Sequence, residues 1–236
     1  MTDVAALAER ARGLVPAHGR VILGIAGAPG AGKSTLVEEL LAALRRQPPP
    51  GVGGDWLAHV PMDGFHLADV QLERLGNRRR KGAPDTFDSA GYLAALQRIA
   101  DNGEDTVYVP GFERTLEKPI AAAIAVPPQA RLVVTEGNYL LLQSGHWPQI
   151  RALLREVWFV DLPDATRRER LVARHVAFGK EPDAAVAWVD GPDEANARAV
   201  SQTARYADLV IGGGDPVAGM HDASAPGQAG AELRER

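Results

Sequence analysis

The sequence predicts an α/β protein whose helices cover both faces of a mostly parallel sheet in three layers. Short apolar runs that indicate buried strands alternate along the chain with segments of helical periodicity. This alternation is typical of βαβ units, which build parallel sheets. The chain has 236 residues, of which 45% are hydrophobic, so it is long enough to bury such a core.

The expected elements follow in order from these periodicities. Val4, Leu7 and Ala11 recur at helical spacing, so residues 3–15 should form an amphipathic helix. Further helices are expected at 33–46, 67–75, 90–100, 165–178 and 193–206. Strands are expected at 20–26, 56–61, 106–109, 131–135, 156–160 and 208–211. Residues 213–236, rich in Gly, Ala, Pro and Ser, should form a flexible tail after a domain of residues 1–212.

Charge and composition exclude several classes of protein. The net charge of −4 provides no basic field of the kind that binds nucleic acid. The absence of cysteine excludes a disulfide scaffold, a Cys-ligated zinc site and a thiol nucleophile. The first residues mix charges among apolar positions, unlike a signal peptide, and no apolar run is long enough for a membrane span. We therefore expect a cytoplasmic protein with neither a nucleic acid nor a membrane as partner.

A phosphate-binding loop is predicted between the first strand and the helix that follows it. The motif G-x-x-x-x-G-K-S consists of Gly27, Ala28, Pro29, Gly30, Ala31, Gly32, Lys33 and Ser34, with Thr35 next to it. Backbone N–H groups and the positive end of the helix dipole hold phosphate oxygens in such a loop. Lys33 would contact the β- and γ-phosphates of ATP, and the Ser34 hydroxyl would ligate Mg²⁺. The alternative is a Gly-rich turn without a ligand.

Acidic residues follow three of the predicted strands, and ligands of open α/β sheets bind beyond the carboxyl ends of the strands. Asp63, Glu136 and Asp161 should therefore lie near one crevice. Asp63 would accept the proton of an attacking hydroxyl, and Gly64 beside it would leave room for a substrate. Glu136 would hold Mg²⁺ through water. The alternative for both Asp63 and Glu136 is a helix-capping acid.

Basic residues form two groups. Arg167, Arg170 and Arg174 recur on one face of a predicted helix, where they would neutralise charge on a transferred phosphoryl group. Their helix, in a segment of residues 166–182, would then act as a lid. The alternative is a solvated helix face. The run at 78–81 favours a solvated turn.

These motifs, in this order, resemble the phosphoribulokinase/uridine kinase/pantothenate kinase superfamily of P-loop kinases. The resemblance rests on the phosphate loop, MDGF at 62–65, PDTFD at 84–88, EGNY at 136–139 and YADLVI at 206–211. It covers most of residues 20–211. The run at 80–88, with PMDGFHL and EGNYLLL, is similar to a bacterial nucleoside/nucleotide kinase branch that is uridine kinase-like. The resemblance implies a P-loop NTPase fold with a helical lid.

The resemblance also implies roles for individual residues. Asp63 matches the proposed base and Glu136 the Mg²⁺ acid of uridine kinases. His66 takes the place of a tyrosine that uridine kinases have at this position, so this contact to the substrate differs from theirs. Substrate contacts are implied at His66, Asp85, Phe87, Asp88, Arg114 and Tyr139, and lid contacts at Arg167 for the nucleotide and at Arg170 and Arg174 for catalysis. Arg114 belongs to residues 108–118, where the superfamily has a substrate-facing hairpin.

The function predicted from the sequence is transfer of the ATP γ-phosphoryl group to a hydroxyl of a small molecule, with ATP and Mg²⁺ as cofactors. A nucleoside is favoured over a sugar or a pantothenate-like alcohol. Carboxylates of Asp63, Asp85 and Asp88 would bind hydroxyls and repel an acceptor that already bears phosphate. A P-loop ATPase or GTPase regulator, which would lack an acceptor, and an inactive nucleotide-binding module are the alternatives. The sequence is compatible with assembly into a homo-oligomer.

Overall fold

The computed structural model describes residues 2–212, so the predicted tail at 213–236 lies outside the described residues. Five strands form one sheet in the order β2-β5-β1-β6-β7, and every neighbouring pair is parallel. The strands are β1 (Val21–Gly27), β2 (Leu57–Pro61), β5 (Leu132–Gly137), β6 (Glu156–Asp161) and β7 (Leu209–Gly212). The central strands β1 and β5 are buried along nearly their whole length, as expected for a sheet covered on both faces.

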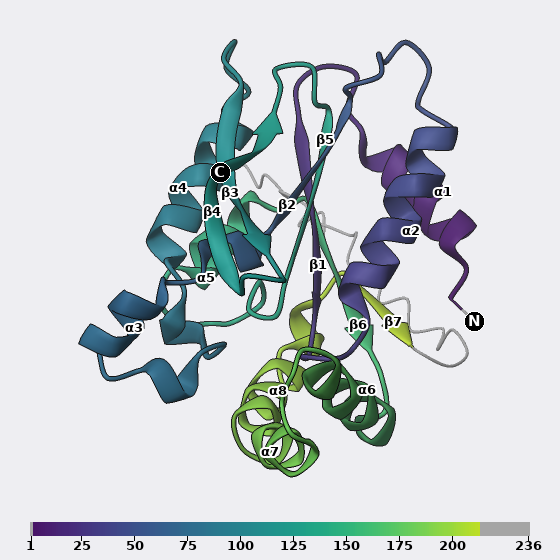
Figure 1. The fold of residues 1–236 in the computed structure, drawn as a ribbon. Helices are drawn as coiled ribbons and strands as arrows, with labels where there is room; N and C mark the ends of the chain where they lie inside the picture. Colours follow the sequence, from purple (N-terminus) through teal and green to yellow (C-terminus); the bar gives the residue numbers. More distant parts are fainter. Residues whose placement is uncertain (1, 213–236) are drawn as a thin grey trace, which may run out of the picture.

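Helices cover both faces of this sheet, which confirms the predicted three-layer fold (Figure 1). Helices α1 (Val4–Leu14) and α2 (Lys33–Arg46) pack on one face. Helices α4 (Ser89–Ala100) and α5 (Trp147–Leu153) pack on the other. The sequence analysis missed α5, which has only seven residues.

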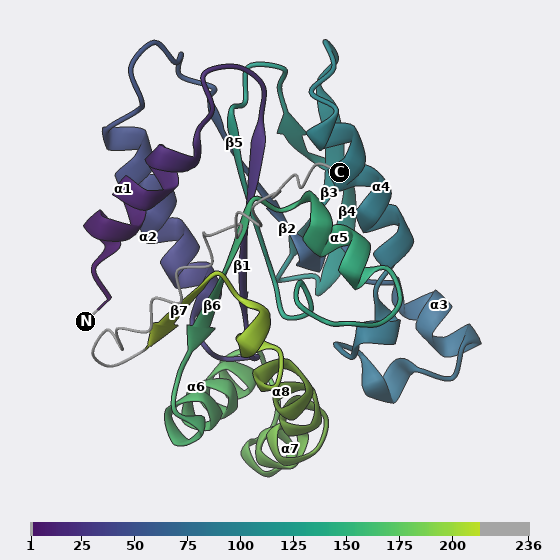
Figure 2. The same cartoon turned by 180° about the vertical axis from the view of Figure 1, so that it is seen from behind.

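The strand expected at 106–109 belongs to a separate antiparallel hairpin. Within residues 2–212, strand β3 (Val107–Glu113) pairs only with β4 (Lys118–Val126). The resemblance implied a hairpin at 108–118, but the periodicity did not predict β4 as a strand. β4 is mostly exposed and rich in alanine, so it lacks the apolar alternation of a half-buried strand. The hairpin lies beside α4, on the α4 and α5 side of the sheet (Figures 1 and 2).

The carboxyl edge of the sheet is flanked by two helical groups (Figure 2). On one side lies α3 (Asp69–Arg74), with the turns that follow it. On the other side α6 (Asp164–Ala177), α7 (Pro182–Trp188) and α8 (Glu194–Ser201) pack together. The expected helix at 193–206 is thus α8 plus a short turn, and α7 was not predicted. Within residues 2–212 no helix has the length and apolarity needed to cross a membrane.

Candidate active site

The phosphate loop joins β1 to α2 and packs closely against α6. Gly30 has a φ of +79°, and a Cβ placed there would lie 2.8 Å from the Arg167 carbonyl oxygen. Only glycine fits both the left-handed backbone and this close approach. The phosphate loop, which leads into the N-terminal end of α2, is therefore in direct contact with α6.

Lys33 is held by three oxygen atoms at the end of the sheet. Its Nζ donates to the carbonyl oxygens of Gly27 at 3.0 Å and Ala28 at 3.1 Å, and to Oδ1 of Asn138 at 2.6 Å. Burial lowers the pKa of Lys33 to about 8, against the opposing effects of the Glu136 and Asp63 carboxylates. The ammonium group is thus poorly solvated and available to an anionic ligand.

Ser34, in the first turn of α2, contacts Glu136, near the carboxyl end of β5. The Ser34 hydroxyl donates to Oε2 of Glu136 at 3.1 Å, and burial raises the pKa of this carboxyl group. A hydroxyl and a carboxylate are the oxygen ligands that Mg²⁺ takes in nucleotide sites, where waters and phosphates complete its coordination. The Ser34 and Glu136 oxygens therefore fit Mg²⁺ bound together with a nucleotide. Among residues 2–212 no cluster of three or more His, Asp or Glu side chains is arranged as a metal site.

Asp63 lies just beyond β2, in the short turn η1 (Met62–Phe65), and Oδ2 is 3.9 Å from Arg114 of the hairpin. The prediction that Gly64 leaves room for a substrate is wrong. A Cβ on Gly64 would lie 2.2 Å from the carbonyl oxygen of Pro110, so the hairpin fills that space. The glycine serves to bring the hairpin, and with it Arg114, against Asp63.

Two adjoining cavities occupy the carboxyl edge of the sheet. The inner cavity, about 150 Å³, is lined by the phosphate loop and the ends of β2 and β5, including Lys33, Ser34, Asp63, Phe87, Glu136, Asn138 and Arg174. The outer cavity, about 220 Å³, extends from there between the two helical groups. Asp63, His66, Arg114 and Arg174 line both, so the two cavities meet at these side chains.

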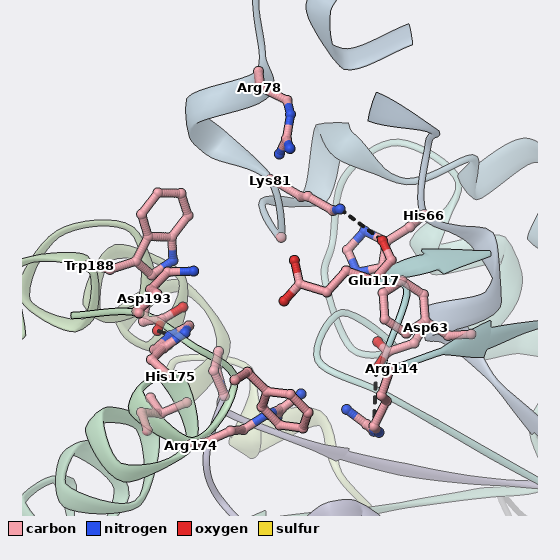
Figure 3. A pocket seen from close by; sticks show the side chains of 16 residues that line it. Asp63, His66, Arg78, Lys81, Arg114, Glu117, Arg174, His175, Trp188 and Asp193 are labelled. Carbon is pink, nitrogen blue, oxygen red and sulfur yellow. Dashed lines mark hydrogen bonds and ion pairs between the residues drawn. The ribbon is translucent and has the colours of Figure 1, made fainter. Parts of the chain in front are cut away.

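Side chains from three parts of the fold converge on the outer cavity (Figure 3). Arg78 and Lys81 come from the segment after α3, and Trp188 and Asp193 come from the opposite wall. His66 stacks on Phe87 with ring centroids 4.0 Å apart and lies 5.3 Å from Phe112. Burial lowers the pKa of His66 to about 4, so its imidazole is neutral at pH 7.

Three predicted substrate residues do not line either cavity. Asp85 pairs with Arg80 at 2.9 Å, and Asp88 caps α4 by accepting from the Gly91 backbone N–H at 2.8 Å. Tyr139 is buried and donates its hydroxyl to the carbonyl oxygen of Gly82. Asp161, expected in the same crevice as the other strand-end acids, is exposed at the end of β6 and lines none of the cavities described.

The three predicted lid arginines have different surroundings. Arg167 is 1% exposed and pairs with Glu194 at 2.5 Å and with Asp164 at 3.3 Å, so it ties α6 to α8. Arg174 faces Arg114 and Asp63, and burial and the Arg114 charge lower its pKa. Arg170 points toward the phosphate loop, with its guanidinium nitrogen 3.4 Å from where a Gly32 Cβ would lie.

A third cavity, about 390 Å³, adjoins the phosphate loop on the side away from Asp63. Thr35 and Arg170 line it together with the apolar side chains of Leu36, Val160, Leu162 and Ile211. A flat apolar ring next to the phosphate loop would fit between such walls. This cavity is therefore the candidate site for the nucleotide base.

Sequence reasoning missed Asn138, Lys180 and Trp188 as site residues, and it assigned Lys81 to a solvated turn. Asn138 had a signal, since it belongs to the EGNY motif. For Lys81 the only sequence signal was the run of basic residues around it, and such a run by itself predicts a solvent-exposed segment. Lys180 and Trp188 carry no local signal, because the packing of α6 against α7 alone brings them to the cavity.

The chain has relatives among curated proteins and solved structures, although no family model matches it. It is 30% identical over 211 residues to a Schizosaccharomyces pombe protein provisionally named uridine kinase C227.14, covering 87% of this chain and 88% of the relative. It is 36% identical over 133 residues to the ATP-dependent kinase-like protein notR' of Aspergillus versicolor, covering 53% and 77%.

A crystal structure gives the same result for the fold. A protein of Silicibacter sp. TM1040, provisionally named a fructose transport system kinase, has a TM-score of 0.79 and 39% identity, covering 89% of this chain and 99% of that one. The phosphate loop, the order of the strands in the sheet and these similarities all indicate the same family. The chain belongs to the uridine kinase-like group of P-loop, ATP-dependent kinases.

Proposed function

We propose that the protein transfers the γ-phosphoryl group of ATP to a hydroxyl group of a small molecule. The observation that carries this proposal is the inner cavity, which is lined by the phosphate loop on one side and by Asp63 on the other. A hydrolytic P-loop protein needs no second cavity beyond the phosphates, whereas the outer cavity here continues past Asp63. Its volume, about 220 Å³, is below the roughly 300–1,000 Å³ of sites for drug-sized ligands, which favours a small acceptor.

The nucleotide end of the site would hold ATP through the loop backbone and Lys33. The Lys33 ammonium is bound by Asn138 and two carbonyl oxygens, and phosphate oxygens of bound ATP would take over some of these bonds. Ser34 and Glu136 would hold Mg²⁺, which lowers the charge repulsion at the β- and γ-phosphates when bound. Arg170 would contact the nucleotide beside the base cavity.

The acceptor end would provide the base and the charge stabilisation. The Asp63 carboxylate would accept the proton of the attacking hydroxyl, as a positioned carboxylate does in general base catalysis. Arg174 and Arg114 face each other where the two cavities meet, and a transferred phosphoryl group between them would relieve their repulsion. The buried Arg167–Glu194 pair would act through structure, by fixing α6 so that Arg174 points into the site.

The test is ATP turnover with and without acceptor alcohols. Purified protein is mixed with Mg²⁺ and ATP, and ADP release is measured alone and with a panel of nucleosides, sugars and their acids or phosphates. A kinase should release little ADP without an acceptor, because closure of the site around the acceptor keeps water out. ADP release at the same rate with every addition and with none would contradict the proposal.

A further inference from the structure

The outer cavity is rich in cationic side chains at the end away from the phosphate loop. Five cations line it, namely Arg78, Lys81, Arg114, Arg174 and Lys180, against the carboxylates of Asp63, Glu117 and Asp193. Asp193 is hydrogen-bonded to His175 at 2.7 Å. Arg114 and Arg174 also line the inner cavity, where the phosphoryl group would pass. Arg78, Lys81 and Lys180 line only the outer cavity and lie beyond the transfer position.

A single carboxylate holds two of these outer cations in place. Asp69 lies 3.0 Å from Arg78 and 2.9 Å from Lys81, and it is not part of the cavity lining. Lys81 also donates to the Glu117 carbonyl oxygen at 3.1 Å, which fixes its ammonium group against the hairpin. Arg78 and Lys81 share this one ion-pair partner, and the Glu117 carboxylate, which also lines the cavity, makes no side-chain bond to either of them within residues 2–212.

The third outer cation lies on the opposite wall. Lys180 has its Nζ 5.1 Å from the centroid of the Trp188 ring, and within residues 2–212 it makes no ion pair. Figure 3 shows Trp188 across the cavity from Arg78 and Lys81. Positive groups therefore face the same space from both sides, an arrangement that favours an anionic ligand group between them.

The acids that would favour an uncharged polyol are mostly elsewhere. Asp85 and Asp88 are engaged with Arg80 and the start of α4, as described above. Glu117 is the one carboxylate of the outer cavity beyond Asp63 that makes no side-chain bond within residues 2–212. The Glu117 carboxylate could accept a hydrogen bond from one hydroxyl of the acceptor. Arg78, Lys81 and Lys180 would then be available to bind a negatively charged group of the same molecule.

We propose that the acceptor carries a phosphate or carboxylate group, in addition to the hydroxyl that is phosphorylated, and that Arg78, Lys81 and Lys180 bind this group. The inference rests on the proposed kinase function and narrows its substrate class to small hydroxylated anions. It replaces the expectation of an uncharged nucleoside, which rested in part on the carboxylates of Asp85 and Asp88, and neither of these lines the cavity.

The experiment compares matched acceptors that differ only in the anionic group: a pentose and its 5-phosphate, a hexose and its sugar acid, and a nucleoside and its 5′-monophosphate. For each compound ADP release gives kcat/KM, and calorimetry gives binding to the protein. In at least one pair the anionic member should exceed its neutral partner by about 100-fold in kcat/KM, as expected when charge-assisted bonds are lost. The phosphate and carboxylate pairs show which of the two anions is bound.

Variants locate the anion. Arg78→Gln and Lys180→Gln should each raise KM for the preferred anionic acceptor about 10-fold or more and leave KM for ATP unchanged. Arg79→Gln is the matched control, because Arg79 is an exposed neighbour of the same charge that does not line the cavity. Two variants on opposite walls guard against misfolding of either one.

The outcomes separate this inference from the kinase proposal. Equal or better turnover of the neutral members, or an equal effect of Arg79→Gln, would overturn the anionic acceptor and leave the kinase function standing. Binding of an anionic member that depends on Arg78 and Lys180, with ADP release that no acceptor changes, would support the anion site and contradict the kinase. No preference in binding or turnover would overturn the inference.

Discussion

The two ends of the site differ in how their charged groups are held. At the nucleotide end, Lys33 and Ser34 have close partners in Asn138 and Glu136, at 2.6 and 3.1 Å. At the acceptor end, the Asp63–Arg114 pair is 3.9 Å apart, and neither Arg174 nor Lys180 forms an ion pair within residues 2–212. The charged groups of the nucleotide end thus have close partners, whereas at the acceptor end Arg78 and Lys81 share Asp69 and the remaining Lys and Arg side chains have no close ion-pair partner within residues 2–212.

The difference follows from the elements that supply each end. The nucleotide end is built from the buried central strands β1 and β5 and the start of α2, whose positions are fixed by the sheet. The acceptor end is supplied by a hairpin, the turns after α3 and the α6–α8 group, which lie at the periphery. Peripheral segments can change between relatives without loss of the core, so we expect this end to decide the acceptor.

The largest effect is expected at the acceptor end. Asp63→Asn should lower kcat by roughly 10²–10⁴, the usual contribution of a general base, and leave the Kd for ATP nearly unchanged. Steady-state kinetics and nucleotide calorimetry measure the two quantities. Asp161→Asn is the control, because Asp161 is also a strand-end acid but lines no described cavity. Weaker ATP binding with unchanged turnover would instead assign Asp63 to the nucleotide end.

Lys33→Ala should reduce phosphoryl transfer by roughly 10²–10³ or more, since it removes a preformed charge at the phosphates. Unlike Asp63→Asn, it should also weaken ATP binding. Circular dichroism should be unchanged, while exposed Lys118→Ala on the hairpin should keep full activity. Retention of more than a few per cent of activity in Lys33→Ala would contradict the role of the phosphate loop.

The α6–α8 group depends on a buried ion pair. Glu194→Gln leaves the Arg167 guanidinium with only the exposed Asp164, and it should cost about 1–3 kcal/mol, less than the ~3–5 kcal/mol for losing a fully buried partner. Chemical denaturation measures the loss, and hydrogen exchange should speed up in α6 and α8. Glu181→Gln, at the exposed start of α7, is the control. Equal stability of the two variants would show that the pair does not hold the group.

The smallest effect concerns pH. The pKa of Lys33 in the fold, about 8, lies below the lysine value of 10.5, so the charged form is disfavoured on folding. ATP binding needs the charged form, so the Kd for ATP should rise as pH increases above 8, by up to about tenfold per pH unit. Below pH 7 Lys33 is almost fully charged, so its contribution to the Kd for ATP should change little with pH. Calorimetry from pH 6.5 to 9.5 checks it, and in Asp63→Asn the rise in Kd should begin at a lower pH, because the Asp63 carboxylate raises the pKa of Lys33. A Kd that stays constant to pH 9.5 would contradict the lowered pKa.

The sequence by itself determined the parallel α/β class, the phosphate loop and the positions of Asp63 and Glu136 at the ends of their strands. These depend on short-range patterns: buried apolar runs, a glycine-rich turn between a strand and a helix, and a polar residue where a strand ends. Parallel strands bring their carboxyl ends to one edge, so Asp63 and Glu136 could be placed in one crevice before the structure was known. The short helix α5 and strand β4 were missed because their local patterns are weak.

Only the tertiary structure decided which charged side chains face the cavities. Asp88 matched a substrate motif but caps α4, and Arg167 shares a helix face with Arg174 but is buried against Glu194, 27 positions away. Lys81 belongs to an ordinary basic run, yet Asp69 and the hairpin hold it at the acceptor end. Sequence spacing gives the side of an element on which a residue lies. The partner of a charge is selected by distant segments that pack against that side, because each buried charge must be paired or hydrogen-bonded.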